Sequence, residues 1–238
     1  MTYSEVVAEA KKHSEEMLRN GDYSYGKVTF SQCDTWIKGN QINLWTYWQG
    51  YQIENIDEGV DIMLVGQDWG SPKNNPDLIA KIEKIQKGEE ILYYTDEPSP
   101  TDRNLSDLFK KTFNIDIKGN NPEKSVFFTN YCLGYRKGNE SGGMTKTLMK
   151  KDEELFDELV MAIKPKIIIC LGKMTYEMVS KTRVKNFVKT LNEGKPLVAT
   201  YPFDERIKVY GVPHCGALGE KNIGGFDKML KVWEGISF

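Results

Sequence analysis

Residues able to do chemistry follow four short apolar runs of this sequence. Asp68 supplies a carboxylate, Asn130 a primary amide and His214 an imidazole, each at the end of such a run. Glycines beside them let backbone N–H groups approach a ligand closely. An acid, an imidazole and a two-way hydrogen-bonding amide are the groups used for acid–base chemistry and polar recognition. The segments concerned are Gly66-Gln67-Asp68-Trp69-Gly70, Asn130-Tyr131-Cys132-Leu133, Gly172-Lys173 and residues 213–219.

The four runs themselves are typical of buried strands. They span Asp61–Gly66, Ser125–Asn130, Lys166–Gly172 and Ile207–Val212, and continuous apolar runs are expected of parallel strands covered on both faces. Helical spacing connects Leu105, Leu108 and Phe109, then Leu155 to Ile163 before Pro165, then Phe226 to Trp233. This alternation predicts a three-layer α/β/α fold with a central, mainly parallel four-stranded sheet, whose carboxyl edge collects ligands.

The length of 238 residues suits one domain, which we divide into an N-terminal helix and covering segment over 1–59 and an α/β core over 60–238. The chain begins with a predicted helix that has a capping box from Thr2 to Glu5 and a terminating Gly21. Residues 22–60 show little periodicity and predict short pieces over the core.

Composition excludes several classes. Lys and Arg total 32 against 34 Asp and Glu, so a polyanion must be bound by a local basic patch. The four cysteines form no CxxC pair and the chain has two histidines, which argues against a metal centre. No run reaches the roughly 20 apolar residues of a membrane span. We therefore expect a cytoplasmic, reduced protein without metal, cofactor or membrane contact.

With these motifs in order, the sequence resembles the uracil-DNA glycosylase superfamily over about residues 60 to 234. The resemblance rests on GQD at 66–68, NYCLGYR at 130–136, PKIIICLG at 165–172 and HCGAL at 214–218. The segment LYYTDEPSPTDRNLSDLF at 92–109 looks like the family's path from a base-stacking aromatic through a Pro/Ser-rich loop into a helix. Members of this family flip a damaged base out of DNA and hydrolyse its N-glycosidic bond.

The resemblance implies two catalytic residues. Asp68 stands where part of the family has the carboxylate that positions water and stabilises the oxocarbenium-like sugar. His214 corresponds to the family's neutral imidazole, which donates a hydrogen bond to the base carbonyl as negative charge develops there. The simpler interpretations are that Asp68 caps the next turn and that His214 satisfies a loop carbonyl.

Base binding is implied for Gly66, the backbone N–H of Gln67, Asn130 and Tyr94. Asn130 offers an acceptor and a donor that match the N3–H and O4 edge of uracil, whereas cytosine presents the opposite pattern. Tyr94, or alternatively Tyr93, would stack on the base. An asparagine in a turn and an aromatic pair in the core are the alternatives.

DNA contacts are implied elsewhere. Leu218 corresponds to the wedge that fills the space of the extruded nucleotide, unless it folds back on Trp69 or Met229. Ser99 and Thr101 would contact the DNA backbone through hydroxyl and N–H groups, together with Gly172 and Lys173. Further lysines could contact phosphates or simply form a solvated surface: Lys137, Lys146, Lys150, Lys151 and Lys221.

These observations predict a monomeric, monofunctional hydrolase of DNA repair that excises uracil or a related deaminated base. The alternative is a non-catalytic nucleic-acid or nucleotide-binding protein on the same fold. It is favoured by Trp69-Gly70, where many family members have Pro-Tyr or Pro-Gly, and by the slightly acidic charge. A flavodoxin-like enzyme for a small phosphorylated molecule has no Walker lysine or GxGxxG to support it.

Overall fold

The computed structural model describes all residues except 26–27, 33–52, 54, 70–98, 118–124 and 138–141. The chain divides into two compact units, each built from separate stretches of sequence. The first unit comprises Met1–Gly59, Gln67–Tyr93 and Phe128–Lys164, and the second comprises Val60–Gly66, Tyr94–Phe127 and Pro165–Phe238. Each unit is described by itself. The predicted single domain with a boundary after residue 59 stays a prediction.

The first unit combines helices with a small antiparallel sheet. Its three strands lie in the order β1-β2-β5, with β2 paired to both neighbours, so that Phe30 of β2 faces Arg136 of β5. The elements of this unit are α1 (Tyr3–Arg19), β1 (Tyr23–Tyr25), β2 (Val28–Gln32), the short helix η3 (Ile56–Glu58), β5 (Gly134–Lys137), α4 (Lys146–Met149), the short helix η5 (Lys150–Asp152) and α5 (Glu153–Ile163).

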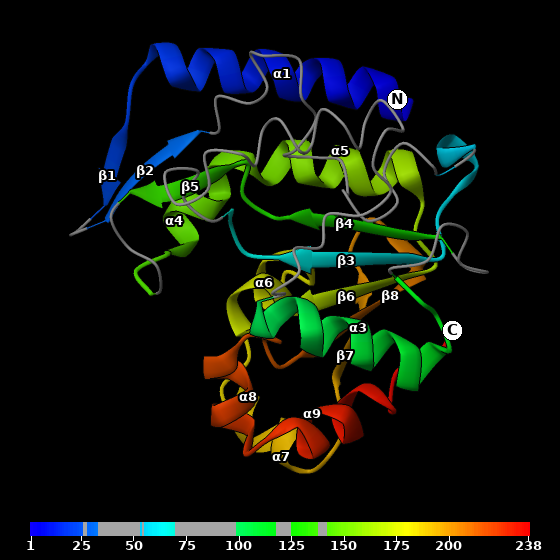
Figure 1. The fold of residues 1–238 in the computed structure, drawn as a ribbon. Helices are drawn as coiled ribbons and strands as arrows, with labels where there is room; N and C mark the ends of the chain where they lie inside the picture. The colour runs from blue at the N-terminus through cyan, green and yellow to red at the C-terminus, as the bar shows by residue number, and fades with distance from the viewer. Residues whose placement is uncertain (26–27, 33–52, 54, 70–98, 118–124, 138–141) are drawn as a thin grey trace. The chain divides into compact units, whose positions relative to one another are not determined.

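Helix α1 begins and ends as the sequence predicts. The Thr2 hydroxyl accepts the Glu5 N–H, and the Glu5 carboxylate accepts the Thr2 N–H at 2.7 Å, so the capping box is confirmed. Gly21 follows the helix with φ of 79°. Val6 and Ala10 of α1 are fully buried, and α1 lies along α5 (Figure 1). Burial of this apolar face stabilises α1 more than its intrinsic propensity does.

A five-stranded sheet in the order β4-β3-β6-β8-β7 is the central sheet of this mixed α/β fold, which helices flank (Figure 1). Its strands are β3 (Ile62–Gly66), β4 (Val126–Asn130), β6 (Ile167–Leu171), β7 (Leu197–Tyr201) and β8 (Asp204–Val212). β6 pairs in parallel with β3 and with β8, and β7 pairs antiparallel with β8. The prediction of a mainly parallel sheet is confirmed.

The predicted count of four strands is wrong, because the described residues form five strands in the central sheet. The additional strand, β7, alternates exposed and less exposed residues along an edge, and Val198 is 58% exposed. The sequence prediction selected continuous apolar runs, which are typical of strands buried on both faces. An edge strand with one solvated face lacks such a run, and so it was missed.

Helices of the second unit pack on this sheet and on one another. They are α3 (Pro100–Phe113), α6 (Lys173–Val179), α7 (Phe187–Asn192), α8 (Ala217–Ile223) and α9 (Phe226–Trp233). Helices α6 and α9 contact β8, α7 contacts β7, and α3 lies against α9 (Figure 1). Trp233 of α9 is fully buried and its ring meets Phe109 of α3 at 5.6 Å between centroids. The predicted helices around Leu105, Leu155 and Phe226 are confirmed as α3, α5 and α9.

Candidate functional site

Two of the predicted strand-end motifs lie side by side in the first unit. The Cys132 N–H donates to the Gln67 carbonyl at 3.0 Å, and the Trp69 N–H donates to the Gly134 carbonyl at 3.1 Å. Trp69 also forms an isolated β-bridge with Tyr135. These backbone contacts bring the GQD segment against NYCLGYR, although 62 residues separate Asp68 from Asn130 in the chain.

Asp68 is held by Arg136 of β5 through both carboxylate oxygens. Arg136 Nε lies 2.6 Å from Oδ2, and Nη2 lies 3.1 Å from Oδ1. The Gln67 side chain also donates to Oδ1, at 3.2 Å. The Asp68 side chain is 3% exposed and that of Arg136 is 11% exposed, so the pair is largely removed from water. This bidentate geometry fixes the carboxylate in direction and stabilises its ionised form.

Asn130 is the last residue of β4 and is 7% exposed. Its backbone carbonyl accepts the Thr129 hydroxyl at 3.2 Å. Gly66 ends β3, the neighbouring strand in the sheet, and is buried. Asn130 is therefore placed at a strand end, as the sequence predicts, two residues before the backbone contact between Cys132 and Gln67.

A second carboxylate organises the NYCLGYR segment. Asp152 is 1% exposed; its Oδ2 accepts the Leu133 N–H at 2.8 Å and its Oδ1 lies 2.9 Å from His13 Nε2 of α1. The hydrogen bond with Asp152 raises the pKa of His13 above its ordinary value. Burial raises the pKa of the neighbouring Cys132 thiol, with a further contribution from the Asp152 and Asp68 charges. This thiol is thus kept neutral.

His214 lies in the second unit, after β8, and is exposed. The Gly216 N–H donates to His214 Nδ1 at 2.9 Å. Since a backbone amide can only donate, Nδ1 must be the acceptor, and the hydrogen of the neutral ring then resides on Nε2. The loop thereby makes Nε2 a hydrogen-bond donor.

The His214 loop is fixed by α3. Asn104 Nδ2 donates to the Cys215 carbonyl at 2.8 Å and to Glu220 Oε2 at 2.9 Å. A Cβ added at Gly216 would lie 3.0 Å from the Thr101 hydroxyl, which shows how closely α3 approaches the loop. A Cβ at Gly219 would lie 1.9 Å from the His214 carbonyl oxygen, so only glycine fits there.

Gly172 and Lys173 also lie near this loop. The Gly172 N–H donates to the carbonyl of Val212, two residues before His214, at 2.9 Å. Gly172 has φ of 91°, a conformation that favours glycine between β6 and α6. The second unit therefore brings together the start of α3, the start of α6 and the His214 loop.

The remaining residues predicted to contact DNA lie on two helices of the second unit, α3 and α8. Ser99 is the N-cap of α3: its hydroxyl accepts the Asp102 N–H at 3.2 Å and donates to Oδ2 of Asp102 at 2.8 Å. Thr101 is part of the first turn of α3 rather than of a loop. Leu218 is 64% exposed on α8, so it does not fold back into the core.

Sequence reasoning missed three positioning residues. Arg136 was visible as the last residue of the NYCLGYR motif, but its partner was not predicted. Asn104 and Asp152 carried no signal, because their backbone partners, the Cys215 carbonyl and the Leu133 N–H, lie 111 and 19 residues away in sequence. The predicted stacking residue Tyr94, its alternative Tyr93, and Gly70 lie outside the described residues.

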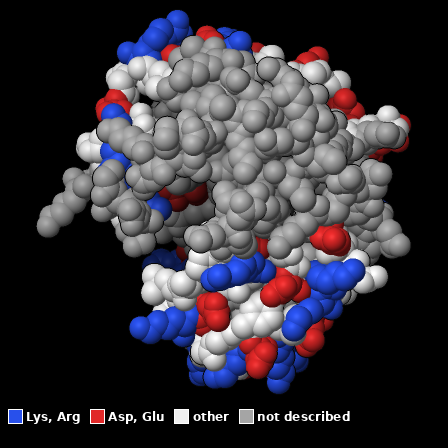
Figure 2. Space-filling model, in the orientation of Figure 1, with Lys and Arg blue, Asp and Glu red and all other residues white. Residues whose placement is uncertain are grey.

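Other site types receive no support from the part of the chain that the structure describes. No group of three or more His, Cys, Asp or Glu there could hold a metal ion. No helix among these residues is long and apolar enough to cross a membrane. On the described surface that faces the viewer in Figure 2, Lys and Arg are interspersed with Asp and Glu.

Comparison with models of known protein families and with curated protein sequences finds no match to this chain.

Proposed function

We propose that this protein is a DNA glycosylase of the uracil-DNA glycosylase type, which hydrolyses the N-glycosidic bond of uracil or a related deaminated base. The observation that carries the proposal is the hydrogen bond from the Gly216 N–H to His214 Nδ1. It leaves an Nε2–H donor on a neutral ring, which is the form that stabilises a departing pyrimidine oxyanion without giving up its proton. The protein acts as a monomer and needs no metal or cofactor.

In the proposed reaction the C1′–N bond breaks and a water oxygen bonds to C1′. The electron pair of the broken bond leaves with the base, and His214 Nε2–H donates to the base oxygen on which the charge collects. The ionised Asp68 carboxylate stabilises the cationic sugar, and the water proton is released as the abasic sugar forms. The products are the free base and an abasic site.

Base recognition is assigned to Asn130. A buried asparagine at a strand end loses less affinity to competing water than an exposed one, and its amide matches the N3–H and O4 edge of uracil. Cytosine would leave one donor and one acceptor mismatched. The exposed Leu218 is assigned to the space that the flipped nucleotide vacates.

One observation favours a second candidate function, a nucleic-acid-binding protein without excision activity. Arg136 engages both oxygens of Asp68, and the Asp68 side chain is 3% exposed. An ion pair of this kind orders a loop whether or not the carboxylate meets a sugar. In this candidate, Asp68 has a structural role only.

The test is alkali cleavage of end-labelled oligonucleotides, single- and double-stranded, each with one uracil, hypoxanthine, xanthine or mispaired thymine. Wild type is compared with Asp68→Asn and His214→Ala, and with Asp107→Asn on the exposed face of α3 as the control. We expect cleavage at one damaged base, wild-type rates for the control, and rates lowered about 10²-fold or more in the two site variants.

Three other outcomes are informative. Strand cleavage that both site variants retain would overturn the assignment of Asp68 and His214. Binding of DNA without any cleavage, by protein that is folded, would establish the second candidate instead. Failure both to bind and to cleave DNA would overturn the two candidates together.

A further inference from the structure

The segment between α6 and α7 has an unusual charge for this chain. From Met178 to Asn192 the sequence contains no Asp or Glu, but it contains Lys181, Arg183, Lys185 and Lys189. The whole chain has a net charge of −2, so this stretch is a local concentration of positive charge.

The cationic side chains of this segment point outward from an anchored backbone. Arg183, Lys185 and Lys189 are exposed. Between them, Val184 is half-buried and Phe187 is 7% exposed. Among the described residues, none of these three cations forms an ion pair. Their charges are thus available to a partner, while the residues between them fix the chain to the unit.

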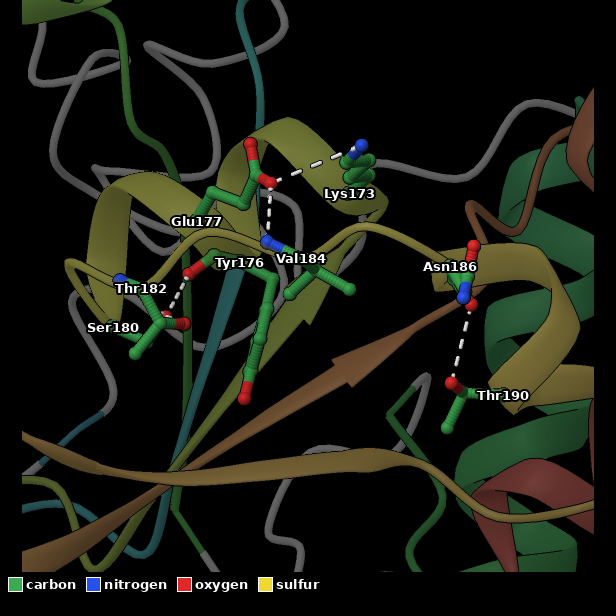
Figure 3. A network of polar contacts seen from close by, with 8 residues as sticks. All are labelled: Lys173, Tyr176, Glu177, Ser180, Thr182, Val184, Asn186 and Thr190. Carbon is green, nitrogen blue, oxygen red and sulfur yellow. Dashed lines mark hydrogen bonds and ion pairs between the residues drawn. The ribbon is translucent and has the colours of Figure 1, made fainter.

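Glu177 holds this backbone in place from α6. Its side chain is 6% exposed, and its Oε1 accepts the Val184 N–H at 2.7 Å. The same oxygen lies 3.9 Å from Nζ of Lys173. Figure 3 shows the carboxylate of Glu177 between the Lys173 ammonium and the backbone of Val184. One buried carboxylate therefore connects Lys173 with the basic segment.

Hydroxyl groups fix both ends of the segment (Figure 3). At its start, the Ser180 hydroxyl donates to the Tyr176 carbonyl and lies 2.6 Å from the Thr182 hydroxyl. At its end, the Thr190 hydroxyl donates to the Asn186 carbonyl at 3.1 Å. A backbone fixed in this way loses little conformational entropy when its side chains bind a ligand.

We propose that Arg183, Lys185 and Lys189, together with Lys173, form a contact surface for the phosphate backbone of DNA. Spaced cations on a fixed backbone suit a regularly spaced polyanion, since each can neutralise one phosphate and release its counterion. Backbone contacts of this kind set register and affinity but read no base. This inference rests on the DNA binding of the proposed function and not on excision.

The experiment measures binding of a fluorescein-labelled, undamaged 20-base-pair duplex by anisotropy, as a function of salt. The triple variant Arg183→Gln, Lys185→Gln, Lys189→Gln is compared with Lys195→Gln, Lys228→Gln, Lys231→Gln. The control removes the same charge from three exposed positions of the same unit. We expect the first variant to bind roughly 10- to 100-fold more weakly, with a log–log salt slope lower by about 3, and the control to bind like wild type.

A second comparison tests the role of Glu177. Removing an acid from a DNA-binding surface should strengthen binding if charge alone matters. We expect Glu177→Ala to weaken binding several-fold instead, because Val184 loses its anchor, and Glu177→Gln to keep wild-type affinity, because its amide oxygen still accepts the Val184 N–H. Thermal melting of both variants verifies that they are folded.

The outcomes separate this inference from the proposed function. Equal affinity and salt slope in the triple variant and wild type would overturn the contact surface, even if excision is observed. Weaker DNA binding in the triple variant, in a protein that excises no base, would support the surface while the glycosylase proposal fails. Absence of DNA binding by wild type would overturn the surface.

Discussion

Arg136 binds both carboxylate oxygens of Asp68, with Nε at 2.6 Å from Oδ2 and Nη2 at 3.1 Å from Oδ1. The two residues come from different strand-end segments. The hydrogen bond from the Trp69 N–H to the Gly134 carbonyl keeps those segments aligned. Gly142 adds a further constraint, since its carbonyl accepts from Nη1 of Arg136. The direction of the Asp68 carboxylate is therefore set by the fold before any ligand binds.

Substituting either member of this ion pair should lower the stability of the folded protein. We expect Arg136→Gln to lower the free energy of unfolding by roughly 3–5 kcal/mol, because Asp68 would remain as a buried charge without its partner. The double variant Asp68→Asn, Arg136→Gln should lose clearly less than the sum of the single losses. Urea denaturation of all four proteins measures the coupling. The pair of Asp204 with Arg206, whose own side chain is 87% exposed, should show a smaller coupling when treated in the same way, and equal couplings would contradict the buried pair's role.

The tautomer of His214 can be observed directly. We expect nitrogen NMR to show an unprotonated Nδ1 and a protonated Nε2 on this neutral ring, because the Gly216 N–H occupies the Nδ1 lone pair. His13, the other histidine of the chain, provides an internal comparison in the same spectra. A hydrogen on Nδ1 of His214 would contradict the assignment of its Nε2–H as the donor to the base.

Asn104 should act as a positioning residue for His214. Asn104→Ala removes the donor to the Cys215 carbonyl, and we expect stability to fall by roughly 1–2 kcal/mol. In a protein that excises bases, kcat should fall about 10-fold with little change in KM, since the His214 loop would lose its register. Asn222→Ala, at an exposed position of α8, is the control. An unchanged His214 nitrogen spectrum and kcat in Asn104→Ala would refute the positioning role.

His13 should make stability depend on pH. The hydrogen bond with Asp152, and the charges of Asp152 and Glu16, raise the His13 pKa in the folded state above the ordinary 6.5. A raised pKa means that the folded protein binds the proton more tightly, so this stabilisation is complete below pH 6.5 and is lost as pH rises through the folded-state pKa.

We therefore expect His13→Gln to lower stability by roughly 1–2 kcal/mol near pH 6 and by much less near pH 9. Urea denaturation at the two pH values measures the difference. Lys12→Gln, which changes an exposed cation on the same helix, should have a small effect that is equal at both pH values. A loss from His13→Gln that is the same at both would show that the ring acts by packing alone.

The sequence by itself determined the α/β fold class, helix α1 with its capping box, and the strand-end positions of Asp68, Asn130 and His214. These features depend on local patterns: apolar runs, helical spacing and the residues that begin or end an element. Local patterns also explain why β7 was missed, since an edge strand such as Leu197–Tyr201 buries one face and lacks a continuous apolar run.

The tertiary structure alone decided which groups surround those residues. Nothing near Asp68 in the sequence indicates that Arg136 takes both of its oxygens, and nothing near His214 indicates that Asn104, 111 residues before Cys215, fixes its loop. The anchor of the basic segment, Glu177, is likewise recognised by its burial and its bond to Val184. Such contacts depend on how distant segments pack, because a hydrogen bond is sensitive to distances and angles that a sequence pattern does not specify.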